Sequence, residues 1–190
     1  MLPIFHEGME EKQESFMTKL IRSQRQNPDK ISDYHLFVMA QSNVIAGFDT
    51  TAISLTFTLY YLIKYPRVLK KLRDELHSAS RHGSLSKDIT FRETQNLPYF
   101  QAVLKEALRM HSATGLPLWR VVPEGGFELN GTYFPQGSIV GVNSWVAHYD
   151  EEVFVNATEF WPERWIDSDE RRLKSMNEMF IPVSTTVGKR

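Results

Sequence analysis

Residues 31–64 decide the fold, and they read ISDYHLFVMAQSNVIAGFDTTAISLTFTLYYLIK. Asp49 is the one charged residue in the apolar middle of this stretch, and apolar residues fall on every side of a helical projection. A helix that is apolar all round is expected in the interior of a sizeable protein. Ser32 is placed to cap its start, and Pro66 prevents it from continuing. The predicted helix is about 50 Å long, enough to cross a domain.

A transmembrane helix is the first alternative for this stretch. A spanning helix needs about 20 predominantly apolar residues. Polar side chains interrupt the run here, namely Gln41, Ser42, Asn43, Asp49, Thr50, Thr51, Ser54, Thr56 and Thr58. The sequence therefore favours a buried helix of a soluble domain, and we expect no transmembrane segment in this chain.

The composition limits what the chain does. Its 190 residues correspond to one domain or to part of a larger one, and 42% of them are hydrophobic. A net charge of −1 argues against a nucleic-acid partner. The sequence contains no cysteine, which excludes disulfides, thiolate nucleophiles and cysteine-ligated metals. We expect no signal peptide, because no basic segment followed by an apolar one opens the chain.

The remaining pattern predicts a mostly α (α+β) fold in a single partial domain over residues 1–190. A helix begins at Pro66, with a basic face that either is solvated or binds an acidic partner. A helix over 97–111 is expected to have Asn96 as its N-cap. Residues 117–142 alternate as strands do, and Asn130-Gly131 is the strongest short-range signal for a hairpin turn. An aromatic-rich, charged region follows over 160–180, with one ion pair expected inside its FWPERW segment.

Three motifs follow one another along the chain. The first is AGFDTT at 46–51, the second is Glu106-x-x-Arg109, and the third is FWPERW at 160–165. Each is weak alone, since an ExxR on a helix is often a surface pair. In this order, with the hairpin between the second and third, they resemble cytochrome P-450, the haem-thiolate monooxygenase family. The resemblance covers residues 27–182, and the style of loops and hairpin is similar to that of the fungal members.

The resemblance implies a distal site on the long helix. Gly47 would leave room for dioxygen, and Asp49 and Thr50 would handle protons. A hydroxyl can both donate and accept, and a buried carboxylate nearby can exchange protons. The alternative is that Thr50 bonds back to the carbonyl of Ala46 and merely bends the helix.

The same resemblance assigns residues around the haem. Ala46, Gly47 and Arg120 would belong to the cofactor-binding residues, with Arg120 on a strand facing a haem propionate. An arginine suits a carboxylate because its fork can bind bidentately; otherwise Arg120 is a surface strand residue. Residues 113–118 would line the substrate side.

An ion network is the third implication. Glu106, Arg109 and Arg164 would form a buried structural cluster that fixes the loop on the proximal side of the haem. Removing one partner from such a cluster costs about 3–5 kcal/mol. The family further implies an electron-donor reductase and a small organic substrate as partners, and in eukaryotes a typical place on the endoplasmic reticulum membrane.

The chain departs from the family at its decisive motif. The family's iron takes a cysteine thiolate from a loop of the form F-x-x-G-x-R-x-C-x-G, which promotes O–O cleavage. In register from Val183, Arg190 falls where that cysteine belongs, and none of the histidines lies in this loop. The family also places its membrane anchor and most substrate-contacting helices upstream, so the long helix is expected to expose an apolar face here. We therefore expect a fragment that does not catalyse the reaction alone. The alternatives are a non-catalytic helical interaction module or the product of a truncated gene model.

Overall fold

The computed structural model describes residues 14–182 and divides the chain into two compact units, residues 1–49 and 50–190. In the described part of the first unit, helix α1 (Phe16–Gln26) precedes the N-terminal half of helix α2 (Asp33–Lys64). Ser15 caps α1, its hydroxyl accepting a hydrogen bond from the Thr18 amide. The prediction of a single partial domain stays a prediction.

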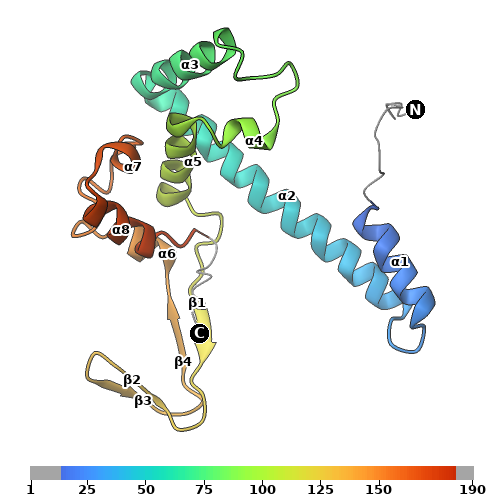
Figure 1. Ribbon diagram of the computed structural model, residues 1–190. Helices are drawn as coiled ribbons and strands as arrows, with labels where there is room; N and C mark the ends of the chain where they lie inside the picture. The colour runs from blue at the N-terminus through green and yellow to red at the C-terminus, as the bar shows by residue number, and fades with distance from the viewer. Residues whose placement is uncertain (1–13, 183–190) are drawn as a thin grey trace. The chain divides into compact units, whose positions relative to one another are not determined.

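The second unit holds the C-terminal half of α2 and the other described elements (Figure 1). The mostly α fold class is confirmed. These elements are helices α3 (Pro66–Arg81), α4 (Phe91–Thr94), α5 (Pro98–Met110), α6 (Ser144–His148), α7 (Arg164–Asp167) and α8 (Glu170–Met179), with strands β1 (Leu118–Val121), β2 (Phe127–Leu129), β3 (Thr132–Phe134) and β4 (Ile139–Val142).

Helix α2 ends just before Pro66, which cannot continue the helix. Lys64 is its last residue, and Pro66 occupies the first turn of α3. A backbone N–H in that turn has no acceptor within the helix, so proline is tolerated there. At the other end, Ser32 precedes α2, and its amide donates to Nδ1 of His35 at 3.2 Å. The third residue of the helix thus binds back to the cap position, as in a capping box.

The predicted burial of α2 is wrong for most of its length. Within the described residues, the helix buries only Tyr61 and Leu62, whereas Val44 and Phe48 are both 70% exposed. The apolar surface that we expected the helix to expose is present. Within the second unit, Tyr61 and Leu62 near the C-terminal end of the helix join the core. In the described part of the chain, no helix is long and apolar enough to span a membrane.

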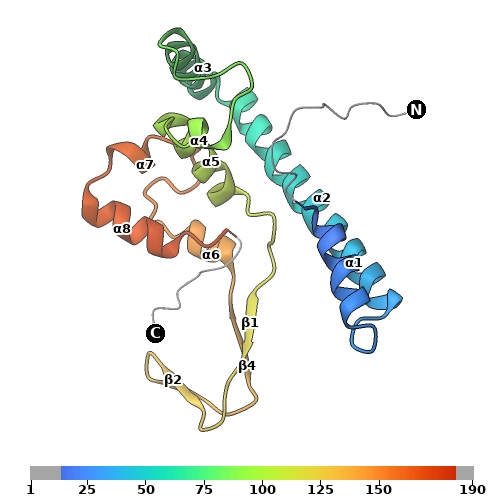
Figure 2. The ribbon, with the colours of Figure 1, turned by 45° about the vertical axis from the view of Figure 1, so that its right-hand side comes forward.

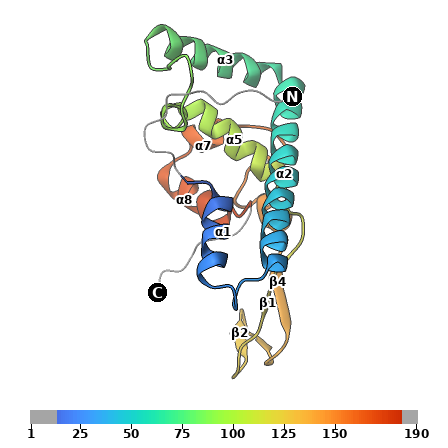
Figure 3. The same ribbon diagram turned by 90° about the vertical axis from the view of Figure 1, so that its right-hand side faces the viewer.

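Two apolar clusters pack against different faces of α5, which lies between α3 and the α7–α8 segment (Figure 1, Figure 3). Val103 and Ala107 pack toward α3, whereas Ala102 packs with Phe154 and Trp165. Val103 and Ala107, four positions apart, share one helix face, whereas the adjacent Ala102 points in another direction, so one helix can hold two layers together. The core of the second unit is therefore built around α5.

The N-terminus of α5 differs from the prediction. Leu97 takes the cap position and makes no side-chain cap bond, so Asn96 is not the N-cap. Glu75 of α3 instead accepts hydrogen bonds from the amides of Tyr99 and Phe100, each at 2.8 Å. Pro98 has no N–H, so these amides are the next free donors of the first turn. A carboxylate there also suits the positive end of the helix dipole.

The strands form two small antiparallel ladders. Strand β1 pairs with β4, Leu118 opposite Val142, and β2 pairs with β3. Figure 2 shows the β1–β4 ladder leading from the helices to the β2–β3 hairpin. Asn130 and Gly131 both have positive φ, 49° and 75°, as a type I′ hairpin turn requires. The predicted hairpin is confirmed.

Candidate functional site

Glu106 on α5 is the centre of a buried polar cluster, and its side chain is fully inaccessible. Three residues further on the same helix face, Arg109 donates to it from Nε at 3.0 Å and from Nη2 at 2.9 Å. Arg164 of α7 donates from Nε at 3.0 Å. The Trp161 amide and the Trp165 indole Nε1 add bonds of 3.1 and 2.9 Å. One carboxylate therefore satisfies donors from two distant segments.

The two guanidiniums bring an excess positive charge into the cluster, and backbone carbonyls take up their remaining donors. Arg109 Nη1 donates to the His148 carbonyl at 2.7 Å, and Arg164 Nη1 donates to the Val155 carbonyl at 2.7 Å. Burial lowers the pKa of Arg164, although Glu106 opposes this. The cluster thus binds the loop between α6 and α7 to α5.

Aromatic faces line the same cluster. The Arg109 guanidinium lies 5.2 Å from the ring centre of Phe154, and that of Arg164 lies 5.0 Å from Trp161. A guanidinium is weakly hydrated and stacks well on rings, so such contacts reduce the cost of burying it. The structure brings Glu106, Arg109 and Arg164 together as the sequence predicted; their role beside a haem stays a prediction.

The ion pair expected within FWPERW is absent from the described structure, because its two charged residues have other partners. Arg164 binds Glu106, whereas Glu163 binds Arg67 and Lys71 of α3 and accepts a hydrogen bond from the Tyr99 hydroxyl at 3.2 Å. Arg67 and Lys71 are four residues apart and share one helix face. Part of the basic face of α3 is therefore occupied by an internal carboxylate, a partner that sequence analysis missed because it lies more than ninety positions away.

The pairing of Glu163 predicts a pH dependence of stability. Burial by itself raises the pKa of this carboxyl, but hydrogen bonds from Arg67 and Lys71 outweigh burial and lower the pKa to about 2. A pKa that is depressed in the folded state gives stability that is complete above the ordinary carboxyl range and is lost as the pH falls toward 2. We expect Glu163→Gln to cost about 1–2 kcal/mol at pH 6, because the half-exposed cations are partly screened.

Urea unfolding at pH 6 and pH 3 measures this contribution. The gap in unfolding free energy between the wild type and Glu163→Gln should shrink at the lower pH. Glu124→Gln, on an exposed loop position, is the matched control and should show little gap at either pH. A gap that stays constant from pH 6 to pH 3 would contradict the proposed ionic origin.

The predicted distal residues lie on an exposed stretch of α2. Ala46, Gly47, Asp49 and Thr50 are all exposed, so the expectation that Asp49 is a buried carboxylate is wrong for this chain. A Cβ added at Gly47 would meet no atom within 4 Å, as expected for an exposed stretch of helix. Other hydroxyls of this helix bond to the carbonyl four residues earlier, among them Ser54, which donates to Thr50 O at 2.8 Å.

Arg120 lies on β1 opposite Val140 and is exposed. Its Nη1 donates to the carbonyl of the preceding residue, Trp119, at 2.7 Å. It also borders a mainly apolar cavity of about 420 Å³ between the two strand pairs, together with Leu118, Phe127, Leu129, Phe134, Ile139, Val140, Gly141 and Val142. The guanidinium therefore has donors left for a carboxylate, and its contact with a propionate stays a prediction.

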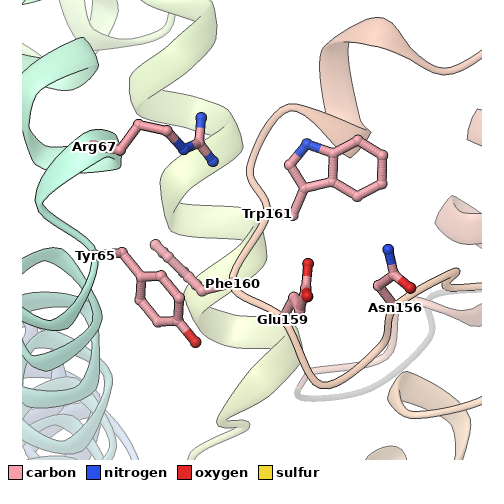
Figure 4. A pocket seen from close by; sticks show the side chains of 6 residues that line it. All are labelled: Tyr65, Arg67, Asn156, Glu159, Phe160 and Trp161. Carbon is pink, nitrogen blue, oxygen red and sulfur yellow. The ribbon is translucent and has the colours of Figure 1, made fainter.

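A second cavity, of about 570 Å³, lies between the start of α3 and residues 156–161 (Figure 4). In Figure 4 the Arg67 guanidinium extends toward Trp161, and Tyr65 lies next to Phe160. The rings of Tyr65 and Phe160 are 5.6 Å apart. None of the predicted site residues lines this cavity. Its walls belong to the aromatic packing that holds the FWPERW segment in place.

A match to a family model decides the identity. The model for cytochrome P450 matches residues 5–185, almost the whole chain. The chain belongs to the cytochrome P450 family. The sequence-based resemblance is thereby confirmed.

Curated relatives agree with this assignment. A cytochrome P450 monooxygenase of Aspergillus terreus is 38% identical over 167 residues, which cover 87% of this chain and 34% of the relative. A pisatin demethylase of Fusarium vanettenii is 46% identical over 129 residues, covering 67% of this chain and 24% of the relative. The monooxygenase easK of Aspergillus fumigatus is 41% identical over 153 residues, covering 80% of this chain and 45% of the relative. The cytochrome P450 chain thus spans about one third of the length of its first relative.

The residues present do not complete a haem site. The family's cofactor is haem with a thiolate ligand, and these 190 residues contain no cysteine. Among the described residues, no cluster of three histidine, aspartate or glutamate side chains could hold a metal ion. The described histidine that is most buried, His148, uses both ring nitrogens in other contacts. The 190 residues therefore contain no thiolate ligand for iron.

Proposed function

We propose that this cytochrome P450 chain is part of a haem-thiolate monooxygenase. The whole enzyme would insert one oxygen atom of O₂ into a small organic substrate, with electrons from a reductase partner. The Glu106–Arg109–Arg164 cluster carries this proposal, because it joins the ExxR motif and the FWPERW motif in one buried contact. The names of the similar fungal proteins support the same reaction class.

The residues predicted for the distal site fit into this proposal as candidates. Gly47, Asp49 and Thr50 lie close together in the same helix. Arg120 would bind a propionate through the donors that Trp119 leaves free. These assignments stay proposals, to be tested by substitution in the whole enzyme.

Sequencing transcripts beyond codon 190 in all three frames tests the assignment of the parent. We expect a downstream G-x-R-x-C-x-G, and we expect the longer product to oxygenate an organic substrate when supplied with a reductase and O₂. A longer product that binds haem through a cysteine yet oxygenates nothing in a broad substrate panel would contradict the monooxygenase proposal.

We further propose that these 190 residues alone do not catalyse the reaction. After addition of haem, reduction and exposure to CO, we expect no thiolate-type red-shifted Soret band, because the chain has no thiolate to give. The absorption spectrum is the measurement, and haem in buffer without protein is the control. A red-shifted band from the 190-residue chain would overturn this proposal.

The exposed apolar surface of α2 favours a second candidate, a non-catalytic helical interaction module. Residues such as Val44, Phe48 and Ile63 are at least 70% exposed, and large exposed apolar surfaces often mark partner sites. Co-purification with a full-length relative, without bound haem, would favour this candidate. Restoration of oxygenation by a longer product would favour the enzyme.

A further inference from the structure

His148 is a fully buried histidine that the motifs did not single out, and it lies at the end of α6. Its Nδ1 is 2.9 Å from the Arg109 carbonyl oxygen and 3.2 Å from the Ser112 hydroxyl. Its Nε2 is 2.9 Å from the amide nitrogen of Ile181. The imidazole thus connects the end of the ExxR helix with the segment after α8.

The partners determine the tautomer of this ring. A carbonyl oxygen only accepts, so the proton lies on Nδ1 and points toward Arg109; an amide only donates, so Nε2 is the bare acceptor for Ile181. Burial lowers the pKa of His148 to about 4, although the Arg109 carbonyl opposes the shift. At neutral pH the ring is therefore uncharged and makes both bonds at once.

The bond to Arg109 is reciprocal. Arg109 Nη1 donates to the backbone carbonyl of His148 at 2.7 Å, while the His148 ring donates to the backbone carbonyl of Arg109. The ring also stacks on Phe180, with ring centres 5.5 Å apart and planes 23° apart. The ring is thus held from three sides, and the Ile181 amide meets an acceptor whose position is already determined.

We propose that His148 is a positioning residue that fixes the peptide at Ile181 and thereby the direction in which the chain leaves the ion network. The effect on the ligand loop rests on the proposed function, under which that loop follows this segment. Phe180, which stacks on the ring, and Ile181, which binds it, are the last described residues before Pro182. A displaced Ile181 would displace the start of that loop.

Two substitutions separate this role from packing. His148→Gln places an amide oxygen near the position of Nε2 and keeps an acceptor for Ile181. His148→Asn places its amide near Nδ1 and keeps only the bond to Arg109. Both variants lose the stack on Phe180, so packing alone predicts similar behaviour.

The test is amide hydrogen exchange of the full 190-residue chain by NMR, with the buried α5 residue Val103 as the internal reference. Relative to Val103, we expect Ile181 to exchange about ten-fold faster in His148→Asn than in the wild type, because one buried hydrogen bond is lost. In His148→Gln we expect exchange close to that of the wild type. Rescue by glutamine but not by asparagine supports the proposal.

Equal exchange of Ile181 in the two variants would overturn the proposal, as would an unprotected Ile181 in the wild type. The readout does not involve haem. If the longer product failed to oxygenate any substrate while the glutamine rescue held, the proposed function would fall and the positioning of Ile181 would remain supported.

Discussion

Replacing Glu106 by glutamine is expected to lower the free energy of unfolding by about 3–5 kcal/mol, because it leaves two buried guanidiniums without their counter-charge. Glu106 is fully inaccessible and binds Arg109 and Arg164 as well as the Trp165 indole. An amide cannot replace it, because its nitrogen would oppose a donor. Urea unfolding monitored by tryptophan fluorescence measures the change.

Glu178→Gln is the matched control for this variant. It makes the same chemical change on an exposed position of α8 and should alter stability by less than about 0.5 kcal/mol. Equal effects of Glu106→Gln and Glu178→Gln would contradict the structural role of the cluster. Arg164→Lys adds a second comparison, because a single ammonium cannot reach both Glu106 and the carbonyls of Val155 and Asn156.

Phe154→Ala is the second substitution with a large expected effect, and it should lower the free energy of unfolding by about 3–5 kcal/mol. The Phe154 side chain is fully buried, packs against Trp165 with ring centres 5.9 Å apart, and lies under the Arg109 guanidinium. Its removal leaves a cavity beneath the buried charge as well as the lost apolar contact. The same urea experiment measures the difference.

Phe91→Ala separates this effect from a general cost of losing a phenyl ring. Phe91 is 80% exposed on α4, so its removal should change stability by no more than about 0.5 kcal/mol. If Phe154→Ala were as mild as Phe91→Ala, the cluster around α5 would not be a cooperative core.

The two variants test the same structure, a platform formed by α5 and the loop between α6 and α7, through two different interactions. Glu106 holds the loop between α6 and α7 by charge, and Phe154 holds it by packing. His148 continues this platform toward Ile181. Under the proposed function the ligand loop would follow these residues, so we expect the stability of the cluster and the position of Ile181 to change together.

Several features could be predicted from neighbouring residues alone. The ExxR spacing places Glu106 and Arg109 on one face because a helix turns once in about 3.6 residues. Pro66 separates two helices because it lacks an N–H, and Asn130-Gly131 turns a hairpin because both residues tolerate positive φ. Hydrogen bonds and backbone preferences of near neighbours determine such elements, and both can be inferred from the local sequence.

Contacts between distant residues could not be predicted in this way. FWPERW suggests that Glu163 and Arg164 pair with each other, yet helical and turn geometry sends their side chains to α3 and α5 respectively. Nothing near His148 in the sequence indicates that its ring would meet the Ile181 amide thirty-three positions away. The N-terminus of α5 likewise took Glu75 of another helix in place of the adjacent Asn96.

The long helix α2 shows most clearly which features depend on local sequence and which depend on tertiary packing. Its sequence by itself determined that residues of α2 form a continuous helix ending before Pro66, since propensity and periodicity are local properties. Whether its apolar faces are buried depends on which elements pack against them, and among the described residues of the helix only Tyr61 and Leu62 are buried. Local hydrogen bonding and periodicity made the helix; only tertiary packing decided its burial and the partners of every buried charge.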